Sequence, residues 1–409
     1  MAWDVIVLGA GAAGMFAAIE AGRRGRRVLV VDHAAKAGEK IRISGGGRCN
    51  FTNLGIRAEA YLGRNPRFAL SALKRFTQWD FVARMDAAGI AWHEKTLGQL
   101  FCDGPATQVV GWLLEEMAAA GVVLWLSCPP GEVARGPRGF TVETPRGVQE
   151  SAALVVATGG KSIPKMGASG FGYRIAERFG LAVTETRPAL VPLTFAEQEL
   201  EWMRPLAGVA LPVRAGVARG DAGPPGSRPG RGKPGAPAAF DEAALFTHRG
   251  LSGPAILQIS SYWREGEAIT LDLLPGQDAA ALLRAAKAAQ GGAQLATALA
   301  RHLPERLARH LAERFGPRGP LAEAPAARLD ALAATLRDWR LVPVGSEGYR
   351  TAEVTLGGVE TDALDARTME AKAVPGLYFV GELVDITGWL GGYNFQWAWS
   401  SGWAAGQVA

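Results

Sequence analysis

The chain has 409 residues, 48% hydrophobic and 20% charged, which is ordinary for a globular protein of two or three domains. No stretch approaches the roughly 18 uninterrupted apolar residues of a membrane span, and a strand pattern begins almost at once, which leaves no room for a signal peptide. The formal net charge is +5, but much of the excess lies in the Pro/Gly-rich spacer at 219–235, which we interpret as a mobile loop. We therefore expect no membrane association, and the charge distribution argues against a nucleic-acid partner.

Cysteine usage indicates the compartment. Cys49, Cys102 and Cys128 show no close pairing along the sequence, which argues against a disulfide framework and against a zinc site. We expect a reducing, cytoplasmic setting and no metal ion.

The first predicted elements are a strand, a glycine turn, a helix and a second strand, all within residues 3–32. A G-x-G-x-x-G pattern alone is weak evidence, but Gly9, Gly11 and Gly14 follow a strand and open a helix. In that context they permit a tight turn, approach of a pyrophosphate to the backbone, and close helix–strand packing. Asp32 ends the second strand, where it would bind a ribose hydroxyl and disfavour a 2′-phosphate. FAD or NAD is therefore preferred over NADP.

Further along the chain, helical patterns occur at about 66–89 and 106–120. The stretch at 122–149 is β-rich and leads into a third buried strand at 153–160. After Pro188 the pattern changes, which indicates that a different domain begins there.

The second half of the chain predicts a strand, a turn and a helix at 245–260, and then short surface helices at about 278–340. Buried strands and glycine loops return beyond that. The fold class we predict is α/β: a Rossmann-like FAD-binding domain with a parallel sheet, interrupted by an inserted β-barrel-like and helical domain. The expected boundaries are 1–187 and 351–409 for the two parts of the FAD-binding domain and 188–350 for the insert.

Three more glycine-rich stretches decide between the two dinucleotides. They are ISGGGRCN at 43–50, VVATGG at 155–160 and VGELVDITGWLGGYNFQ at 380–396. A nicotinamide enzyme needs only one fingerprint, whereas a flavoprotein also recruits distant segments to hold its ring. Together these stretches favour FAD.

The same segments carry a family resemblance. ISGGGRCNFTN, the ATGG strand and GLYFVGELVDITGWLGGYNFQWAWSSGWAAG resemble the FAD-dependent flavoprotein family that includes BaiN, YhiN and aminoacetone oxidase. The resemblance covers nearly the whole chain, and its most specific part is GGGRCN-x-TN. It implies an FAD-binding Rossmann-like domain interrupted by a partly β-barrel-like insert. The chain departs from the family at Phe101-Cys102, where members commonly have Phe-Pro, and in the spacer.

The stretch at 40–53 shows neither helical nor strand periodicity. Arg48 would neutralise the phosphates or the flavin pyrimidine edge, against the alternative of a surface ion pair. Cys49 is interpreted mainly as a packing neighbour of the flavin, because no CxxC exists and Cys102 is far away in sequence. Asn50 and Asn53 could equally close turns or contact the ligand.

Residues 391–396 are expected to form the N-terminus of the last helix and to stabilise the anionic reduced flavin. Asn394 and Gln396 would contact the ring edge. Four tryptophans crowd this end and could wall a substrate pocket, although we expect at least two to pack in the core: Trp389, Trp397, Trp399 and Trp403.

No catalytic residue is identified. His248 and Arg249 in the insert could orient a substrate or move protons, with a structural turn as the equal alternative; Cys49 is a third candidate. The complete set expected to bind FAD is Gly9, Gly11, Ala12, Ala13, Gly14, Asp32, His33, Lys40, Ser44, Gly45, Gly46, Gly47, Arg48, Cys49, Asn50, Val133, Thr158, Gly159, Gly160, Gly381, Glu382, Asp385, Gly391, Gly392, Tyr393, Asn394 and Gln396.

Only one βαβ fingerprint is present, so no separate domain for NAD(P)H is expected. We predict an FAD-dependent oxidoreductase in which NAD(P)H binds transiently and the hydride passes to a small organic substrate. The alternatives are an oxidase for amines or alcohols that uses O₂, and an FAD-dependent tRNA-modifying protein. The oligomeric state is not predicted.

Overall fold

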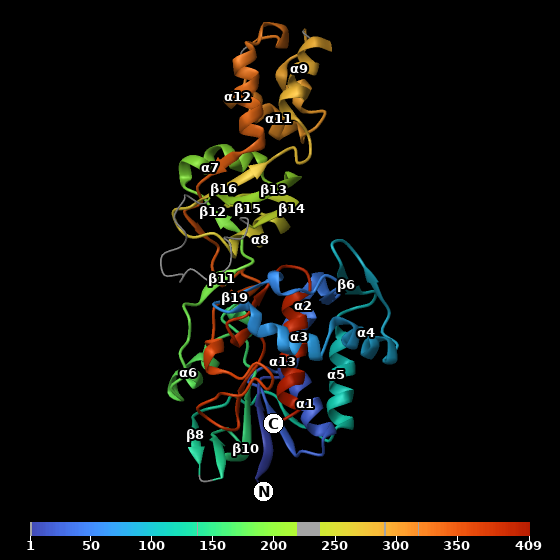
Figure 1. The fold of residues 1–409 in the computed structure, drawn as a ribbon, viewed down its shortest axis with the longest axis vertical. Helices are drawn as coiled ribbons and strands as arrows, with labels where there is room; N and C mark the ends of the chain where they lie inside the picture. Colours follow the sequence, from blue (N-terminus) through green and yellow to red (C-terminus); the bar gives the residue numbers. More distant parts are fainter. Residues whose placement is uncertain (1, 137, 219–237, 290–291, 318) are drawn as a thin grey trace. The chain divides into compact units, whose positions relative to one another are not determined.

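The computed structural model describes residues 2–136, 138–218, 238–289, 292–317 and 319–409, so the predicted spacer at 219–235 lies outside the described residues. The chain forms two compact units (Figure 1). One combines Met1–Pro188 with Glu353–Ala409, and the other is the insert, Ala189–Ala352.

A seven-stranded sheet forms the centre of the first unit. Its order is β7-β2-β1-β10-β9-β8, and β20 also pairs with β10. The pairs that join β7, β2, β1, β10 and β20 are all parallel, whereas β8 and β9 are antiparallel. The strands are β1 (Trp3–Leu8), β2 (Val28–Val31), β7 (Val123–Trp125), β8 (Val133–Gly136), β9 (Gly139–Val142), β10 (Gln149–Val156) and β20 (Leu377–Phe379).

The central strands are apolar runs because both of their faces are covered. Val5–Leu8 and Val28–Val31 are almost completely buried, as expected for parallel strands between layers of helices. This confirms the predicted α/β class with a parallel sheet. The helices of this unit are α1 (Ala12–Arg23), α2 (Glu39–Gly47), α3 (Ala69–Arg75), α4 (Gln78–Ala87), α5 (Thr107–Ala119), α6 (Phe171–Arg178) and α13 (Tyr393–Gly406).

Helix α13 packs closely along α1 (Figure 1). Glycine makes this possible, because a Cβ at Gly402 would lie closer than 3.0 Å to the carbonyl oxygen of Ala13. Trp397 and Trp399 of α13 are fully buried in the core, and Trp389 and Trp403 are partly buried against it. At least two of the four tryptophans are therefore core residues, as expected.

Three small sheets complete this part of the chain. One has the order β3-β6-β5, and the others pair β4 with β21 and β11 with β19. Their bounds are β3 (Asn50–Asn53), β4 (Tyr61–Leu62), β5 (Trp92–Glu94), β6 (Gln99–Cys102), β11 (Arg187–Ala189), β19 (Val354–Leu356) and β21 (Thr387–Gly388).

The insert contains a second seven-stranded sheet, ordered β17-β16-β13-β14-β15-β12-β18 and antiparallel at each pairing. The strands are β12 (Leu193–Thr194), β13 (Ala210–Ala218), β14 (Ala239–Thr247), β15 (Gly250–Ser252), β16 (Ala268–Asp272), β17 (Trp339–Leu341) and β18 (Gly345–Ser346). The helices are α7 (Glu197–Met203), α8 (Pro254–Ser260), α9 (Ala279–Ala289), α10 (Leu295–Leu299), α11 (Glu305–Phe315) and α12 (Ala326–Arg337). Within the described residues, no helix is both long and apolar enough to cross a bilayer.

Candidate cofactor site

The three fingerprint glycines have different surroundings. A Cβ at Gly9, which has φ +109°, would lie 2.5 Å from the carbonyl oxygen of Ala157, and a Cβ at Gly14 would meet the carbonyl oxygen of Gly9. These two positions must therefore be glycine for the β1–α1 turn to pack against the end of β10. At Gly11, by contrast, a Cβ would meet no protein atom within 4 Å. The backbone at Gly11 is open to a ligand.

The first turn of α1 fits an anionic group. No side chain caps the helix at Gly11, and no acidic residue lies in the first turn. The N–H groups of Ala12 and Ala13 are thus available to a phosphate, which the helix dipole also favours. This open, uncapped turn is the feature of the structure that suits the pyrophosphate of FAD.

Asp32 braces this turn. Its carboxylate accepts hydrogen bonds from Ala10 N at 2.6 Å and Ala34 N at 2.8 Å. The His33 ring lies beside it, with Nδ1 3.2 Å from the Asp32 oxygen. Both residues therefore lie at the end of β2, next to the fingerprint.

The stretch at 40–53 contains two regular elements that its sequence did not predict, separated by an irregular glycine segment. It forms α2, kinked where Ser44 has an extended ψ of 147° and Gly45 and Gly46 are left-handed, and then strand β3. Glycine makes the kink possible because it adopts positive φ without a steric penalty. Packing is a second reason why position 45 must be glycine, because a Cβ there would lie 2.7 Å from the Phe101 ring.

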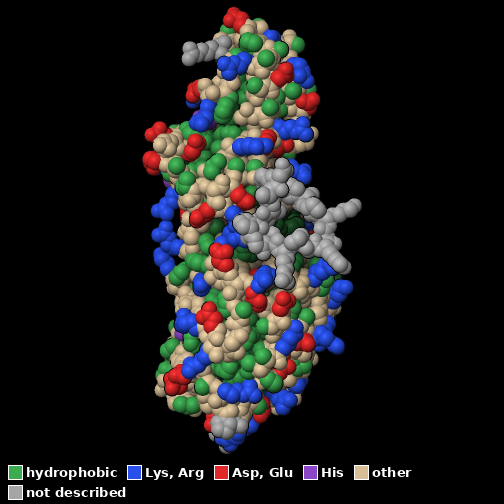
Figure 2. Space-filling model, turned by 60° about the vertical axis from the view of Figure 1, so that its left-hand side comes forward, with side chains coloured by type: hydrophobic (Ala, Val, Ile, Leu, Met, Phe, Trp, Pro, Cys, Tyr) green, Lys and Arg blue, Asp and Glu red, His purple; other side chains and the backbone are tan. Residues whose placement is uncertain are grey.

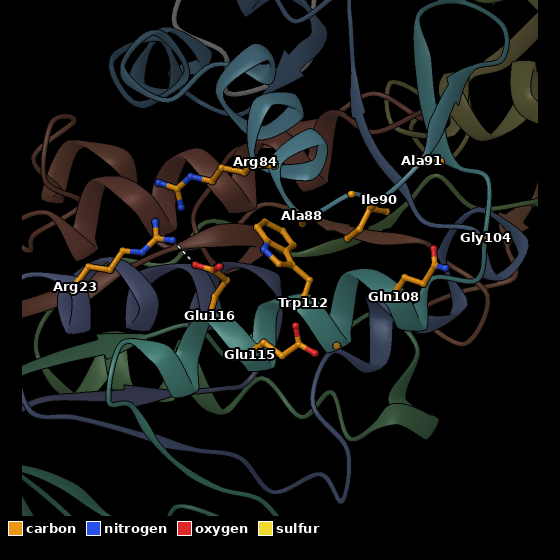
Figure 3. Close-up of a pocket in the computed structure, with 13 residues that line it drawn as sticks. Arg23, Arg84, Ala88, Ile90, Ala91, Gly104, Gln108, Trp112, Glu115 and Glu116 are labelled. Carbon is orange, nitrogen blue, oxygen red and sulfur yellow. Dashed lines mark hydrogen bonds and ion pairs between the residues drawn. The ribbon is translucent and has the colours of Figure 1, made fainter.

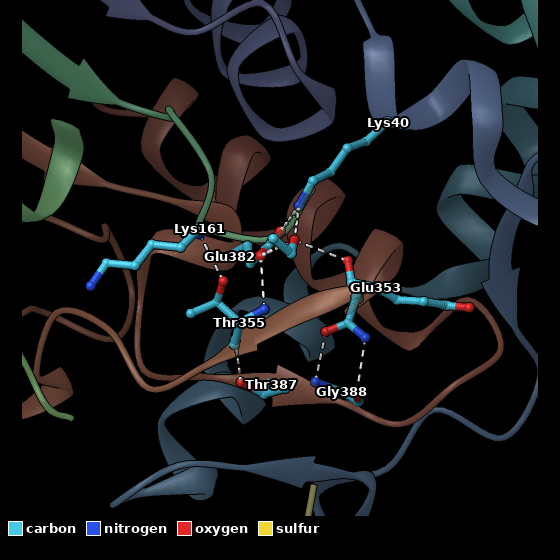
Figure 4. Close-up of polar contacts among 9 residues, drawn as sticks. Lys40, Lys161, Glu353, Thr355, Glu382, Thr387 and Gly388 are labelled. Carbon is cyan, nitrogen blue, oxygen red and sulfur yellow. Dashed lines mark hydrogen bonds and ion pairs between the residues drawn. The ribbon is translucent and has the colours of Figure 1, made fainter. Parts of the chain in front are cut away.

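A polar cluster joins α2 to the other glycine-rich segments (Figure 4). Lys40 Nζ donates to Glu382 Oε2 and to Ser162 Oγ, both at 2.6 Å. Glu382 Oε1 accepts from the backbone N–H of Thr355 at 2.9 Å. Gly160 lets these groups meet, because a Cβ there would lie 2.5 Å from Glu382 Oε1. The cluster thus ties together four segments that are distant in sequence.

The start of α13 is anchored on β3. Asn53 Nδ2 donates to Gly391 O at 2.8 Å, and Thr52 Oγ1 donates to Gln396 Oε1 at 2.6 Å. A Cβ at Gly392 would collide with Thr52 O. The Asn50 amide lies beside Gln99 in the same three-stranded sheet. A Cβ at Gly391 would likewise lie 2.8 Å from the Gln99 side chain, so both glycines before α13 are required by packing.

The predicted ring contacts of Gln396 and Asn394 are corrected by the structure. Gln396 is 0% exposed, and its amide nitrogen donates to Phe76 O and Ser400 Oγ. The Asn394 amide accepts from Gly388 N at 2.8 Å and donates to Gly388 O at 2.9 Å. Both amides are used within the protein, so they brace the turn before α13.

Three other predicted residues have side chains directed into the protein. Thr158 Oγ1 faces Gly172 and has no hydrogen-bond partner among the described residues. Val133 lies in β8 with its side chain in the core, and the Tyr393 ring packs against Tyr61. For these residues a ligand contact through the backbone stays a prediction. Gly159 is different, because a Cβ there would meet no atom within 4 Å.

The remaining candidate site residues lie in the α2 segment and in the insert. Arg48 is exposed, and its guanidinium forms no recorded ion pair within the described part of the chain, so the surface-pair alternative finds no support. Ser44 Oγ donates to Ile41 O at 2.9 Å. A Cβ at Gly46 would meet no atom of the described residues within 4 Å, and one at Gly47 would lie 3.9 Å from Arg42 O. Two candidates of the insert, His248 and Arg249, are exposed in the turn between β14 and β15.

Cys49 and Cys102 are neighbours, contrary to the sequence-based prediction. β3 pairs antiparallel with β6, and Cys102 N donates to Arg48 O at 3.0 Å. Both thiols are buried. Separation along the chain was a poor guide because strand pairing brings distant residues together.

Sequence reasoning also missed Glu353. Desolvation by the surrounding protein raises the pKa of Glu353 to about 6, and Lys40 opposes this shift. The residue is exposed, and in Figure 4 its side chain points away from the cluster. No sequence pattern marks Glu353, because its surroundings come from distant segments.

Asp385 has a structural position that supports a test. Its carboxylate accepts from Arg64 N at 2.9 Å, and burial raises the pKa of Asp385 above its ordinary value of 3.8. The folded state therefore binds more protons than the unfolded state as pH rises above 3.8, so this group lowers stability as pH rises through its folded pKa. We expect Asp385→Asn to gain stability over wild type more at pH 7 than at pH 4. Urea unfolding at both pH values measures this, and an equal difference at both would contradict it.

An open pocket of about 680 Å³ lies elsewhere in the first unit, between α1, α4 and α5 (Figure 3). Arg23 and Glu116 form an ion pair at its edge. None of the residues predicted to bind FAD lines it. This pocket is therefore separate from the predicted cofactor site.

Comparison with known proteins now identifies the family. The model of the HI0933-like protein Rossmann domain matches residues 3–408. The chain belongs to this family. HI0933-like proteins are FAD-dependent oxidoreductases, so the chain is an enzyme of that class.

One curated relative is an Escherichia coli (strain K12) protein named "Ribosomal RNA dihydrouridine synthase". It is 51% identical to this chain, and the similarity covers 99% of this chain and 97% of that protein. A Haemophilus influenzae protein of the same name is 42% identical over 98% and 96%. A Clostridium scindens protein, "3-dehydro-bile acid delta(4,6)-reductase", is 28% identical over 98% of each chain.

These relatives correct one sequence-based prediction. The concentration of basic residues in one spacer argued against a nucleic-acid partner, whereas the two relatives with 51% and 42% identity are named for an activity on ribosomal RNA. The prediction was wrong because it weighed the distribution of charge along the whole chain. Phosphate recognition depends instead on local groups.

Proposed function

We propose that this chain reduces a uridine of ribosomal RNA to dihydrouridine with non-covalently bound FAD. The observation that carries the proposal is the 51% identity to the Escherichia coli protein over nearly the full length of both chains. Because the similarity covers 99% of this chain and 97% of that protein, neither lacks a unit that the other has.

FAD, once reduced, supplies a hydride equivalent to the C5=C6 bond of uracil, and a proton completes the reduction. We include NAD(P)H in the proposal as the source of these electrons, bound transiently, since one fingerprint leaves no second dinucleotide domain. The residues of the chain serve to bind FAD and to orient the segments around it. The open turn at Gly11 suits the pyrophosphate, and the Lys40 cluster orders the segments around it.

A base must leave its stack before an enzyme can reduce it, and cations near the site would bind the displaced backbone. Arg48 is one such exposed cation, on the loop after α2. Figure 2 shows basic and acidic side chains interspersed over much of the visible face.

A second candidate is the reduction of a small unsaturated molecule. The Clostridium scindens relative, at 28% identity, is named for the reduction of carbon–carbon double bonds. That chemistry matches uracil reduction in its bond type, so the two candidates differ in the acceptor and share the use of FAD.

The test uses ribosomal RNA from a strain that lacks its own rRNA dihydrouridine synthase. We expect purified holoenzyme with NADH or NADPH, without oxygen, to form dihydrouridine in that RNA, as measured by nucleoside mass spectrometry. Gly11→Val protein serves as the control without cofactor and should form none. If flavin is reduced by NAD(P)H but dihydrouridine stays absent, the ribosomal RNA proposal fails and the small-molecule candidate gains. Rapid oxidation of an amine or alcohol by O₂ would instead favour an oxidase.

A further inference from the structure

Cys49 and Cys102 lie opposite each other where β3 meets β6. Asn50 pairs with Phe101 in the antiparallel ladder, so the next step of the same register sets Cys49 against Cys102. Two backbone hydrogen bonds support this, from Cys102 N to Arg48 O at 3.0 Å and to Cys49 O at 3.4 Å.

The two side chains also interact. A hydrogen bond between the thiols is the main cause that raises the pKa of Cys49, and it lowers the pKa of Cys102. Cys102 is the more acidic thiol and the better source of thiolate.

The backbone at Cys49 is unusual as well. Its φ is +49°, in a region that residues other than glycine seldom adopt. Such a conformation persists only where the surrounding structure imposes it. Here the kink of α2 and the pairing of β3 with β6 place the Cys49 side chain beside Cys102.

We propose that Cys49 and Cys102 are a redox pair that closes to a reversible disulfide when hydrogen peroxide oxidises the protein. The Cys102 thiolate attacks one peroxide oxygen; an S–O bond forms, the O–O bond breaks, and hydroxide leaves to become water. The Cys49 sulfur then attacks the sulfenic sulfur, so that the S–S bond forms and the S–O bond breaks with release of a second water. In total, two thiols lose two electrons and two protons, and one peroxide becomes two waters.

The oxidant suits a flavoprotein, since reduced flavin yields hydrogen peroxide when O₂ reoxidises it. Only this source of peroxide rests on the proposed function; the disulfide itself does not. The bond would join the loop after Gly45 to the strand of Phe101, against which Gly45 already packs. Oxidation would thus tie down one side of the predicted FAD cradle.

The experiment treats purified holoenzyme with hydrogen peroxide, removes the oxidant with catalase, and alkylates free thiols in denaturant. We expect the count of free thiols to fall from three to one, with dithiothreitol restoring all three. Mass spectrometry without reduction should show the Cys49 peptide linked to the Cys102 peptide. The matched control is Cys128→Ser, because Cys128 is also buried in the first unit; this variant should still lose two thiols.

Cys49→Ser and Cys102→Ser should each abolish the linked peptide. If either variant fails to fold, mapping of the wild-type and Cys128→Ser peptides decides the question without it. Three free thiols after oxidation would overturn the proposal. So would sulfinic acid on either cysteine without a linked peptide, or a linkage only between two molecules.

Discussion

Gly11→Val is expected to give a folded protein that no longer binds FAD. A Cβ at Gly11 meets no protein atom within 4 Å, and the extended backbone there, with φ −84° and ψ −174°, accepts a β-branched residue. The branched side chain would project into the open space beside the first turn of α1, which suits the pyrophosphate. We expect FAD affinity to fall at least about 100-fold, or about 2.8 kcal/mol. Loss of yellow colour and a fluorescence titration measure it.

Gly14→Ala is the matched control for this substitution. Its Cβ would collide with the carbonyl oxygen of Gly9, so the cost should appear in the fold itself. With both proteins compared as apoproteins, the unfolding temperature should therefore be lowered for Gly14→Ala and unchanged for Gly11→Val. A Gly11→Val protein that binds FAD like wild type would contradict the placement of the cofactor.

Gly402→Ala is expected to destabilise the first unit and to weaken FAD binding together. A Cβ at Gly402 would lie closer than 3.0 Å to the carbonyl oxygen of Ala13, and backbone yields less easily than a flexible side chain. Overpacking of this kind costs about 1–3 kcal/mol. Ala13 belongs to the first turn of α1, so a shift there also moves the N–H groups that suit the pyrophosphate. Urea unfolding and FAD titration measure the two effects.

Gly111→Ala adds the same methyl group to the interior of another helix, α5. Nothing lies within 4 Å of a Cβ at Gly111, so we expect a gain of about 0.5–1 kcal/mol from helix propensity. The two substitutions differ chiefly in the space available to the methyl group. Equal shifts in the free energy of unfolding would show that close packing of α13 on α1 is not the cause.

The fingerprint could be predicted because its signals are local. The buried runs Val5–Leu8 and Val28–Val31 and the glycines between them lie within about thirty residues, and their apolar pattern and spacing specify a strand, a turn and a helix. The kinked helix at 39–47 was missed for a local reason also. The left-handed Gly45 and Gly46 interrupt the helix, so its helical part is too short to show a periodicity.

The functions of individual side chains were harder to predict. The sequence predicted that Gln396 contacts the flavin ring. In the structure its amide is completely buried and hydrogen-bonded to Thr52 and Phe76. Cys102 seemed too distant to matter, yet the β3–β6 ladder brings it to Cys49. In each case the partner comes from a remote segment, and composition and spacing carry no information about such pairs.

By itself, the sequence determined the α/β class, the dinucleotide turn and the set of glycine-rich segments that favour FAD. These follow from local apolar periodicity and from glycines whose backbones admit close approach. Tertiary structure alone decided which polar groups in those segments remain free and which are used within the protein, as with Lys40 and Glu382. The physical reason is that a buried polar group must find a partner, and folding selects that partner by proximity in space, whatever the separation along the chain.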